Sequence, residues 1–208
     1  MNREFGSPTL ATTEQYLDIH QPIYDGNQIK IERIDREKVN KEGVIIAYVP
    51  IQGEYFAFAL YINVSSNDIT GIITESRNSV FLKATSTTLT AKQIFEDLDI
   101  VGYTTHWHFE DNINDGAKLS YVVFEPNPEP DEFEDKILKL LLILKSHQEK
   151  LLGLSYAVTY YLHVVMDFHG RNQMLGSIIL SEQCITLLNN LNLKIQFDIT
   201  SWGNTFKS

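Results

Sequence analysis

The sequence has only one cysteine, Cys184, among its 208 residues. A single thiol cannot form a disulfide within the chain, which is typical of a reducing compartment. Long apolar runs are also missing. The run from 137 to 144 is interrupted by Lys139 and is far shorter than the roughly 20 residues that a membrane-spanning helix needs. The first residues lack the basic head and apolar core of a signal peptide, so we expect a cytoplasmic protein that does not bind membranes.

Basic residues are scarce as well. The 17 Lys and Arg residues face 27 Asp and Glu residues, and the formal net charge at pH 7 is −10. A surface of this sign repels the phosphate backbone of nucleic acids, so we expect no nucleic-acid partner. It attracts a basic protein and speeds the encounter, although negative charge also serves solubility alone. The hydrophobic fraction of 43% and the charged fraction of 21% are ordinary for a globular protein.

Motifs that identify a reaction are missing too. The sequence contains no Gly-x-Ser-x-Gly, no P-loop and no GxGxxG. Cys184 lies on the apolar face of a predicted helix, where an inert core thiol is expected rather than a nucleophile. The sequence therefore indicates no enzyme class and no catalytic residue.

Apolar periodicity predicts the order of the strands. The first 27 residues are polar and predict an arm with one short helix near 13–17, followed by a single domain over residues 28–208. Predicted strands cover residues 28–35, 43–51, 54–62, 101–110, 118–125, 155–168, 178–180 and 193–200. Ile69, Ile72 and Ile73 predict a short helix, and residues 76–90 match neither pattern.

Three further helices are predicted from their N-caps. Thr90 and Gln93 form a capping-box pattern, Asp131 is the predicted cap of a long helix that Gly153 ends, and Ser181 caps the last helix. The order of elements predicts an α+β fold. We expect a mostly antiparallel sheet with helices packed on one face, ferredoxin-like in character, plus the N-terminal arm and a hairpin.

Two stretches resemble a known family. Phe56-Ala-Phe-Ala-Leu-Tyr-Ile-Asn63, before Asp68-Ile-Thr70, is similar to the opening of the bacterial domain-of-unknown-function 4279 family. Residues 176–184 and 191–199 resemble its ending. The resemblance covers about residues 54–200 and leaves 1–53 as an addition. It implies a small bacterial α+β domain with a role like that of toxin-neutralising immunity proteins, and it implies no catalytic residue.

Histidines supply candidate metal ligands. His106 and His108 share one face of a predicted strand, and His163 and His169 share one face of another. If the two strands are neighbours, the four imidazoles converge, with a carboxylate from each strand, on a divalent ion such as zinc. In the alternative interpretation, these polar residues only occupy the solvent face of half-exposed strands. The sequence indicates no other cofactor.

An acidic, proline-rich segment is the candidate partner-binding surface. Its carboxylates are Glu129, Asp131, Glu132, Glu134 and Asp135. Prolines stiffen the loop and lower the entropy lost on binding, although acidic residues are expected in a first helical turn anyway. The leading hypothesis is a non-enzymatic, immunity-type protein that occludes a basic protein partner such as a toxin. The alternative is a metal-dependent or small-ligand-binding protein that uses the strand histidines.

Overall fold

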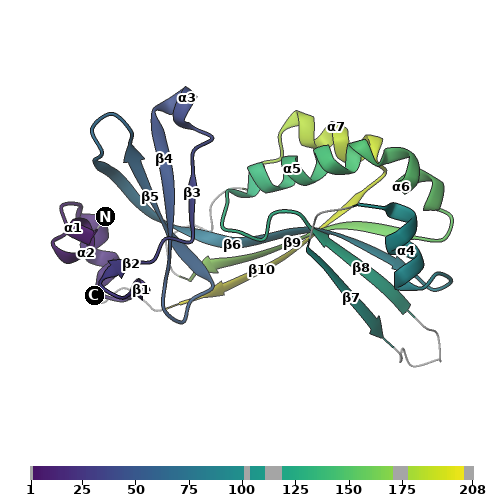
Figure 1. Ribbon diagram of the computed structural model, residues 1–208, viewed down its shortest axis with the longest axis horizontal. Helices are drawn as coiled ribbons and strands as arrows, with labels where there is room; N and C mark the ends of the chain where they lie inside the picture. The colour runs from purple at the N-terminus through teal and green to yellow at the C-terminus, as the bar shows by residue number, and fades with distance from the viewer. Residues whose placement is uncertain (1, 101–103, 111–118, 171–177, 204–208) are drawn as a thin grey trace.

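The computed structural model describes residues 2–100, 104–110, 119–170 and 178–203 (Figure 1). Its organising element is β6 (Ile69–Ser86), a strand of 18 residues. The first part of β6 pairs with β5, and the second part pairs with β9 along one edge and with β8 along the other. β6 thus connects two sheets with separate cores. We call residues 2–75 the N-terminal lobe and residues 76–203 the C-terminal lobe.

β6 corrects one sequence prediction. Ile69, Ile72 and Ile73 were predicted on a short helix, but they lie in this strand together with most of residues 76–90. Isoleucine, threonine and valine are β-branched and favour a pleated strand that packs against a neighbour. The pairing of Leu60 with Ile72 supplies that neighbour from β5. The spacing of the three isoleucines alone could not reveal that β5 is the neighbouring strand.

The N-terminal lobe holds the predicted arm and hairpin. Its elements are α1 (Asn2–Gly6), α2 (Ala11–Leu17), β1 (Tyr24–Asp25), β2 (Gln28–Ile29), β3 (Arg33–Asp35), α3 (Val39–Glu42), β4 (Val44–Pro50) and β5 (Phe56–Asn63). Strands β3, β4, β5 and β6 form an antiparallel sheet in that order. The predicted strand over 28–35 is divided into β2 and β3. Gly53 adopts a φ of 75° in the turn between β4 and β5, as a tight hairpin turn requires.

The arm covers one face of this sheet. Its helices α1 and α2 place Phe5 and Tyr16 against Phe58 of β5, with ring centroids 5.9 and 5.5 Å apart. On the opposite face, Tyr48 of β4 is fully buried. Strands β4 and β5 are therefore apolar on both faces because both faces are covered.

The C-terminal lobe is the ferredoxin-like part. Its further elements are α4 (Ala91–Leu98), β7 (Thr104–Glu110), β8 (Leu119–Glu125), α5 (Phe133–Ser146), α6 (Gln148–Leu154), β9 (Thr159–His169), α7 (Glu182–Asn190) and β10 (Lys194–Trp202). The strand order is β10-β9-β6-β8-β7, antiparallel except that β10 runs parallel to β9. From β6 to β9 the order of elements is βαββααβ, which is the βαββαβ order with its second helix divided into α5 and α6. Helix α7 and β10 add one parallel crossover.

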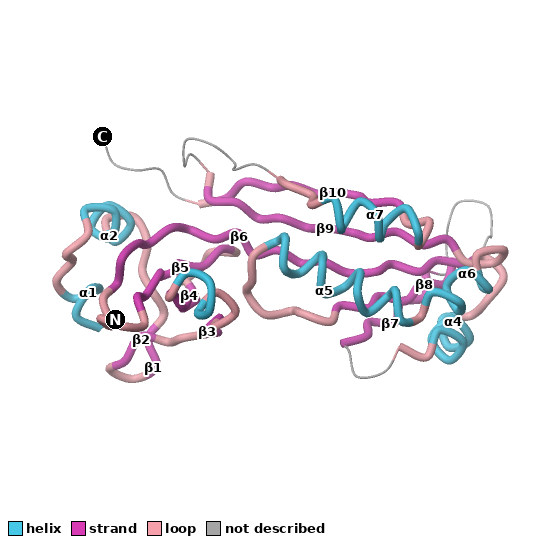
Figure 2. Tube along the Cα trace, turned by 90° about the horizontal axis from the view of Figure 1, so that it is seen from above, coloured by secondary structure: helices cyan, strands magenta, loops and turns pink. Residues whose placement is uncertain are grey.

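Helices α4 to α7 lie on one face of this sheet (Figures 1 and 2), which confirms the predicted α+β fold. Leu82 of β6 and Leu162 of β9 face these helices and pack with Leu140 of α5 in the larger core. Residues 178–180 form no strand. In the described part of the chain, no helix has the length and hydropathy needed to span a bilayer.

Two of the three predicted caps are confirmed. The Thr90 hydroxyl accepts a hydrogen bond from the backbone N–H of Gln93, and the Ser181 hydroxyl accepts one from Cys184. Asp131 is not the cap of α5, because Glu132 occupies that position without a side-chain cap bond. The long predicted helix is also divided at His147 into α5 and α6.

Candidate functional site at the lobe junction

The two lobes meet around a buried pair of histidines. His20 follows α2 in the N-terminal arm, and His169 is the last residue of β9. Their side chains approach with Nε2 atoms 3.0 Å apart, and the residues are only 3% and 4% exposed. The ring of Phe56 borders both imidazoles, with centroids 5.3 and 5.0 Å away. The pair therefore joins the arm to the ferredoxin-like lobe through an aromatic contact.

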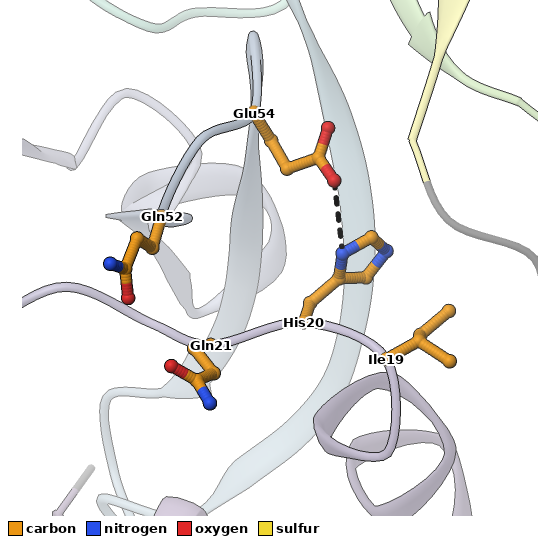
Figure 3. Close-up of a pocket in the computed structure, with 5 residues that line it drawn as sticks. All are labelled: Ile19, His20, Gln21, Gln52 and Glu54. Carbon is orange, nitrogen blue, oxygen red and sulfur yellow. Dashed lines mark ion pairs between the residues drawn. The ribbon is translucent and has the colours of Figure 1, made fainter.

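Glu54, from the turn between β4 and β5, faces the other side of the His20 ring. Its Oε1 lies 3.4 Å from Nδ1 of His20 (Figure 3), without completing a hydrogen bond. Burial, with a smaller contribution from His169, lowers the pKa of His20 to about 4. Burial raises the pKa of Glu54, which His169 partly offsets. His20 is thus a neutral imidazole at pH 7.

A polar depression of about 310 Å³ opens beside this histidine (Figure 3). Its lining residues are Ile19, His20, Gln21, Gln52 and Glu54. The side chains that line it are mostly amides and a carboxylate, which are hydrogen-bonding groups. His20 is thus the member of the pair that borders this depression.

A second, narrower cleft of about 40 Å³ lies at the junction and is acidic. Its lining residues are Glu32, Pro50, Glu54, Tyr55, Phe56, Ala57, Glu75, Ser76, Arg77 and Pro130. Three carboxylates here face one guanidinium. Burial, followed by the charges of Glu132 and Glu134, raises the pKa of Glu75 to about 8. Lys38 opposes this rise, but it is already paired with Glu132 at 2.7 Å.

Ion pairs between β3 and the start of α5 hold the lobes together. Nη1 of Arg33 lies 2.6 Å from Oδ1 of Asp131, and Nζ of Lys139 lies 2.9 Å from its Oδ2. Asp131 is fully buried. Burial alone would raise its pKa, but the hydrogen bonds from Arg33 and Lys139 hold the pKa of Asp131 below its ordinary value. The buried carboxylate is therefore charged and compensated.

Three carboxylates of this network could in principle face a cation. Within the described residues, ligand atoms of Asp35, Asp131 and Asp135 lie within 4.8 Å of one another. Both oxygens of Asp131 are already paired with Arg33 and Lys139. These side chains supply the positive charge that a metal ion would bring, so the cluster needs none.

Comparison with known proteins identifies the C-terminal lobe. A family model described as "Domain of unknown function (DUF4279)" matches residues 76–202, more than half of the chain. The chain belongs to the DUF4279 family. The match begins where β6 changes from pairing with β5 to pairing with β9, so the DUF4279 region coincides with the C-terminal lobe. The resemblance expected over 54–200 is confirmed with a later start. No curated protein and no solved structure matches the chain.

The DUF4279 sheet keeps the predicted histidines apart. His106 and His108 lie on β7, whereas His163 and His169 lie on β9, and β8 and β6 separate these two strands. Because neighbouring strands are about 4.8 Å apart, the β7 and β9 backbones are separated by about 14 Å. The strands are not neighbours, so the condition for the four-histidine site is not met. For β7 the structure describes the strand but not its side chains.

The two histidines of β9 have different surroundings. His163 contacts Asp198 of β10, with Nε2 and Oδ2 2.6 Å apart, on the sheet face opposite the helices. His169 instead contacts His20 at the lobe junction. Sequence analysis did not select His20 and Glu54, which lie in the N-terminal lobe. Nothing in local periodicity links a histidine of a polar arm to a residue 149 positions later.

The acidic segment over residues 129–135 forms ion pairs within the chain through some of its carboxylates. Asp131 is buried in the ion-pair network, and Glu132 pairs with Lys38. Asp135 is half-buried, and burial raises its pKa. Glu129 and Glu134 remain exposed. These two side chains are the part of the candidate binding surface that a partner can reach.

Proposed function

We propose that this DUF4279 protein is a non-enzymatic binding protein that occludes a basic protein partner, in the manner of immunity proteins that neutralise toxins. The observation that supports the proposal is the acidic cleft at the lobe junction. Its volume of about 40 Å³ suits the end of an inserted side chain. Small-molecule sites are typically about 300–1,000 Å³. A lysine or arginine from a partner fits both the size and the charge of this cleft.

The electrostatics of Glu75 favour such a guest. Its carboxyl group holds a proton near pH 7 because burial and neighbouring carboxylates disfavour the charged form. A cationic side chain in the cleft favours the ionised form, so binding releases a proton and creates a charge-assisted hydrogen bond.

The exposed acidic residues guide the encounter. Glu129 directly precedes Pro130, which lines the cleft, and Glu134 lies in the first turn of α5. These charges add to a net charge of −10. Negative charge around a cleft raises the association rate of a basic protein, and salt weakens this effect.

A bacterial, cytoplasmic setting is part of the proposal. Cys184 is buried and forms no disulfide. A free, buried thiol is typical of proteins in reducing compartments.

The proposal is tested by co-expressing the full chain with each basic protein encoded beside its gene. We expect one of them to form a complex on size-exclusion chromatography and to lose its toxicity. In the variant Glu32→Gln/Glu75→Gln/Glu129→Gln, association at 50 mM NaCl should slow about tenfold, and the difference should shrink at 500 mM as screening increases.

Glu149→Gln is the matched control, because Glu149 is exposed on α6, away from the residues that line the cleft. It should bind as the native chain does. The proposal fails if no neighbouring protein forms a complex, or if the triple variant associates at the native rate at low salt.

A further inference from the structure

The geometry of the buried histidine pair differs from that of two imidazoles that meet head-on. The Nε2 atoms of His20 and His169 are 3.0 Å apart, and the ring centroids are 4.7 Å apart. In a head-on contact, each ring adds about 1.1 Å from nitrogen to centroid, so the centroids would be about 5.2 Å apart. The observed separation is shorter. The two rings are therefore not collinear across the hydrogen-bond contact of their Nε2 atoms.

Both separations are obtained if the two Nε2 lone pairs point at one position. If both rings point symmetrically at one position, the centroid–centroid and nitrogen–nitrogen separations are in the same ratio as the distances of a centroid and of a nitrogen from that position. The separations of 4.7 and 3.0 Å then place the point about 2 Å from each Nε2. Metal–imidazole bonds have this length, about 2.0–2.1 Å.

The same separations indicate the kind of ion. With bonds of about 2.05 Å, nitrogens 3.0 Å apart subtend about 94° at the metal. A tetrahedral zinc site would hold its nitrogens about 3.3 Å apart. An angle near a right angle suits square-planar or octahedral coordination, which Cu²⁺ and Ni²⁺ adopt with imidazole ligands.

The surroundings match those of a metal-binding histidine. Such a histidine usually donates its second ring N–H to a carboxylate, and Oε1 of Glu54 lies 3.4 Å from Nδ1 of His20. A polar depression borders His20 and Glu54 (Figure 3).

We propose that His20 and His169 bind one divalent transition-metal ion of the copper and nickel class through their Nε2 atoms. When the ion is bound, Glu54 closes its 3.4 Å separation from Nδ1 of His20 and accepts a hydrogen bond from it, and water completes the coordination. The ion links the N-terminal arm to the DUF4279 lobe. The site shares Glu54 with the acidic cleft, but metal binding is measured on this chain alone, so its failure is distinguishable from failure of the proposed binding function.

The test uses the full chain expressed without a histidine tag and stripped of metal with a chelator. Equilibrium dialysis against Cu²⁺, Ni²⁺ and Zn²⁺, followed by elemental analysis, should find about one ion per chain, with Cu²⁺ bound most tightly. His20→Ala and His169→Ala should each weaken binding at least about 100-fold, and Glu54→Gln should weaken it about 10–100-fold. Copper electron paramagnetic resonance should show coupling to imidazole nitrogens.

His163→Ala is the matched control, because His163 lies on the same strand but contacts Asp198 instead. It should retain full stoichiometry. Thermal unfolding checks that the alanine variants fold. If an alanine variant does not fold, the ligands are identified from the imidazole ¹⁵N resonances of the native chain. Adding Zn²⁺ should shift the resonances of His20 and His169 and of no other histidine. The proposal is overturned if the native chain binds none of the three ions, or if the His20→Ala/His169→Ala double variant still binds one.

Discussion

At the scale of single residues, two ionisable groups stand out because neither is fully compensated: the buried Lys136 and the half-buried Glu75. Lys136 of α5 is 1% exposed, and its Nζ donates a hydrogen bond to the carbonyl oxygen of Asn78. Burial lowers the pKa of Lys136 to about 8, and burial raises the pKa of Glu75 to about 8. Burial shifts the pKa of each group in the direction that favours its neutral form, so each makes stability depend on pH.

For Lys136, the folded pKa of about 8 lies below its ordinary value of 10.5. The folded chain binds fewer protons than the unfolded chain between these values, so stability rises with pH in that window. Below pH 8 the cost of burying the charge is fully present. Lys136→Met should therefore raise the free energy of unfolding by about 1–2 kcal/mol at pH 7 and by less at pH 10.

Urea unfolding at the two pH values measures this difference. Lys145→Met, at an exposed position near the end of the same helix, should leave the free energy of unfolding within about 0.5 kcal/mol of native. A Lys136→Met variant less stable than the native chain at pH 7 would contradict the prediction.

For Glu75, the sign is reversed. Its folded pKa of about 8 lies above its ordinary value of 4.5, so the folded chain binds more protons in between, and stability falls as pH rises from 4.5 to 8. Glu75→Gln should raise the free energy of unfolding by about 1–3 kcal/mol at pH 8.5, with a melting temperature about 2–10 °C higher. At pH 4.5 the two proteins should melt together. A gain that does not grow with pH would show that ionisation of Glu75 is not its cause.

At the scale of the elements, the end of β10 is fitted closely to the histidine pair. Gly203, directly after β10, adopts a φ of 101°. A Cβ built there would lie 2.7 Å from Cδ2 of His169 and 3.1 Å from the ring of Phe56. Glycine is needed both for the backbone conformation and for the close approach of the imidazole.

Gly203→Ala should therefore displace the His169 ring. We expect a loss of about 1–3 kcal/mol in the free energy of unfolding, and metal binding should weaken at the same time. Gly153→Ala is the control, since a Cβ at Gly153 meets no atom within 4 Å. Calorimetric melts and copper titrations of both variants measure the effect. Native stability and affinity in Gly203→Ala would contradict the close fit.

At the scale of the whole molecule, two cores are joined by β6, the histidine pair and the ion pairs of Asp131. The side chain of Arg33 is only 13% exposed, and Asp131 lies 2.6 Å from its guanidinium. Removing one member of a buried pair leaves the other charge uncompensated, which costs about 3–5 kcal/mol. Among the links of the junction, this carboxylate is therefore the one whose removal should cost most.

Asp131→Ala should lower the free energy of unfolding by about 3 kcal/mol or more. Hydrogen exchange should show the β3 region opening before the core around Leu140. Glu134→Ala, in the exposed first turn of α5, should stay within about 0.5 kcal/mol of the native chain. Equal losses in the two variants would show that the junction does not depend on Asp131.

The sequence by itself determined the features that depend on neighbouring residues. The capping box at Thr90, the cap at Ser181, the hairpin at Gly53 and the α+β order of elements each depend on residues a few positions apart. Such local patterns report which face of an element is apolar. The family itself was recognised from short stretches of sequence, of which residues 176–184 and 191–199 lie within the matched region and residues 56–63 and 68–70 lie before it.

Only the tertiary structure decided which elements are neighbours. Periodicity shows that His163 and His169 share a strand face, but it does not show that β6 and β8 separate β9 from β7. It also cannot show that β5 draws Ile69, Ile72 and Ile73 into a strand. The contacts of His20 with His169 and of Arg33 with Asp131 span 149 and 98 positions. Contacts at such distances depend on how the lobes pack, and no local pattern records that.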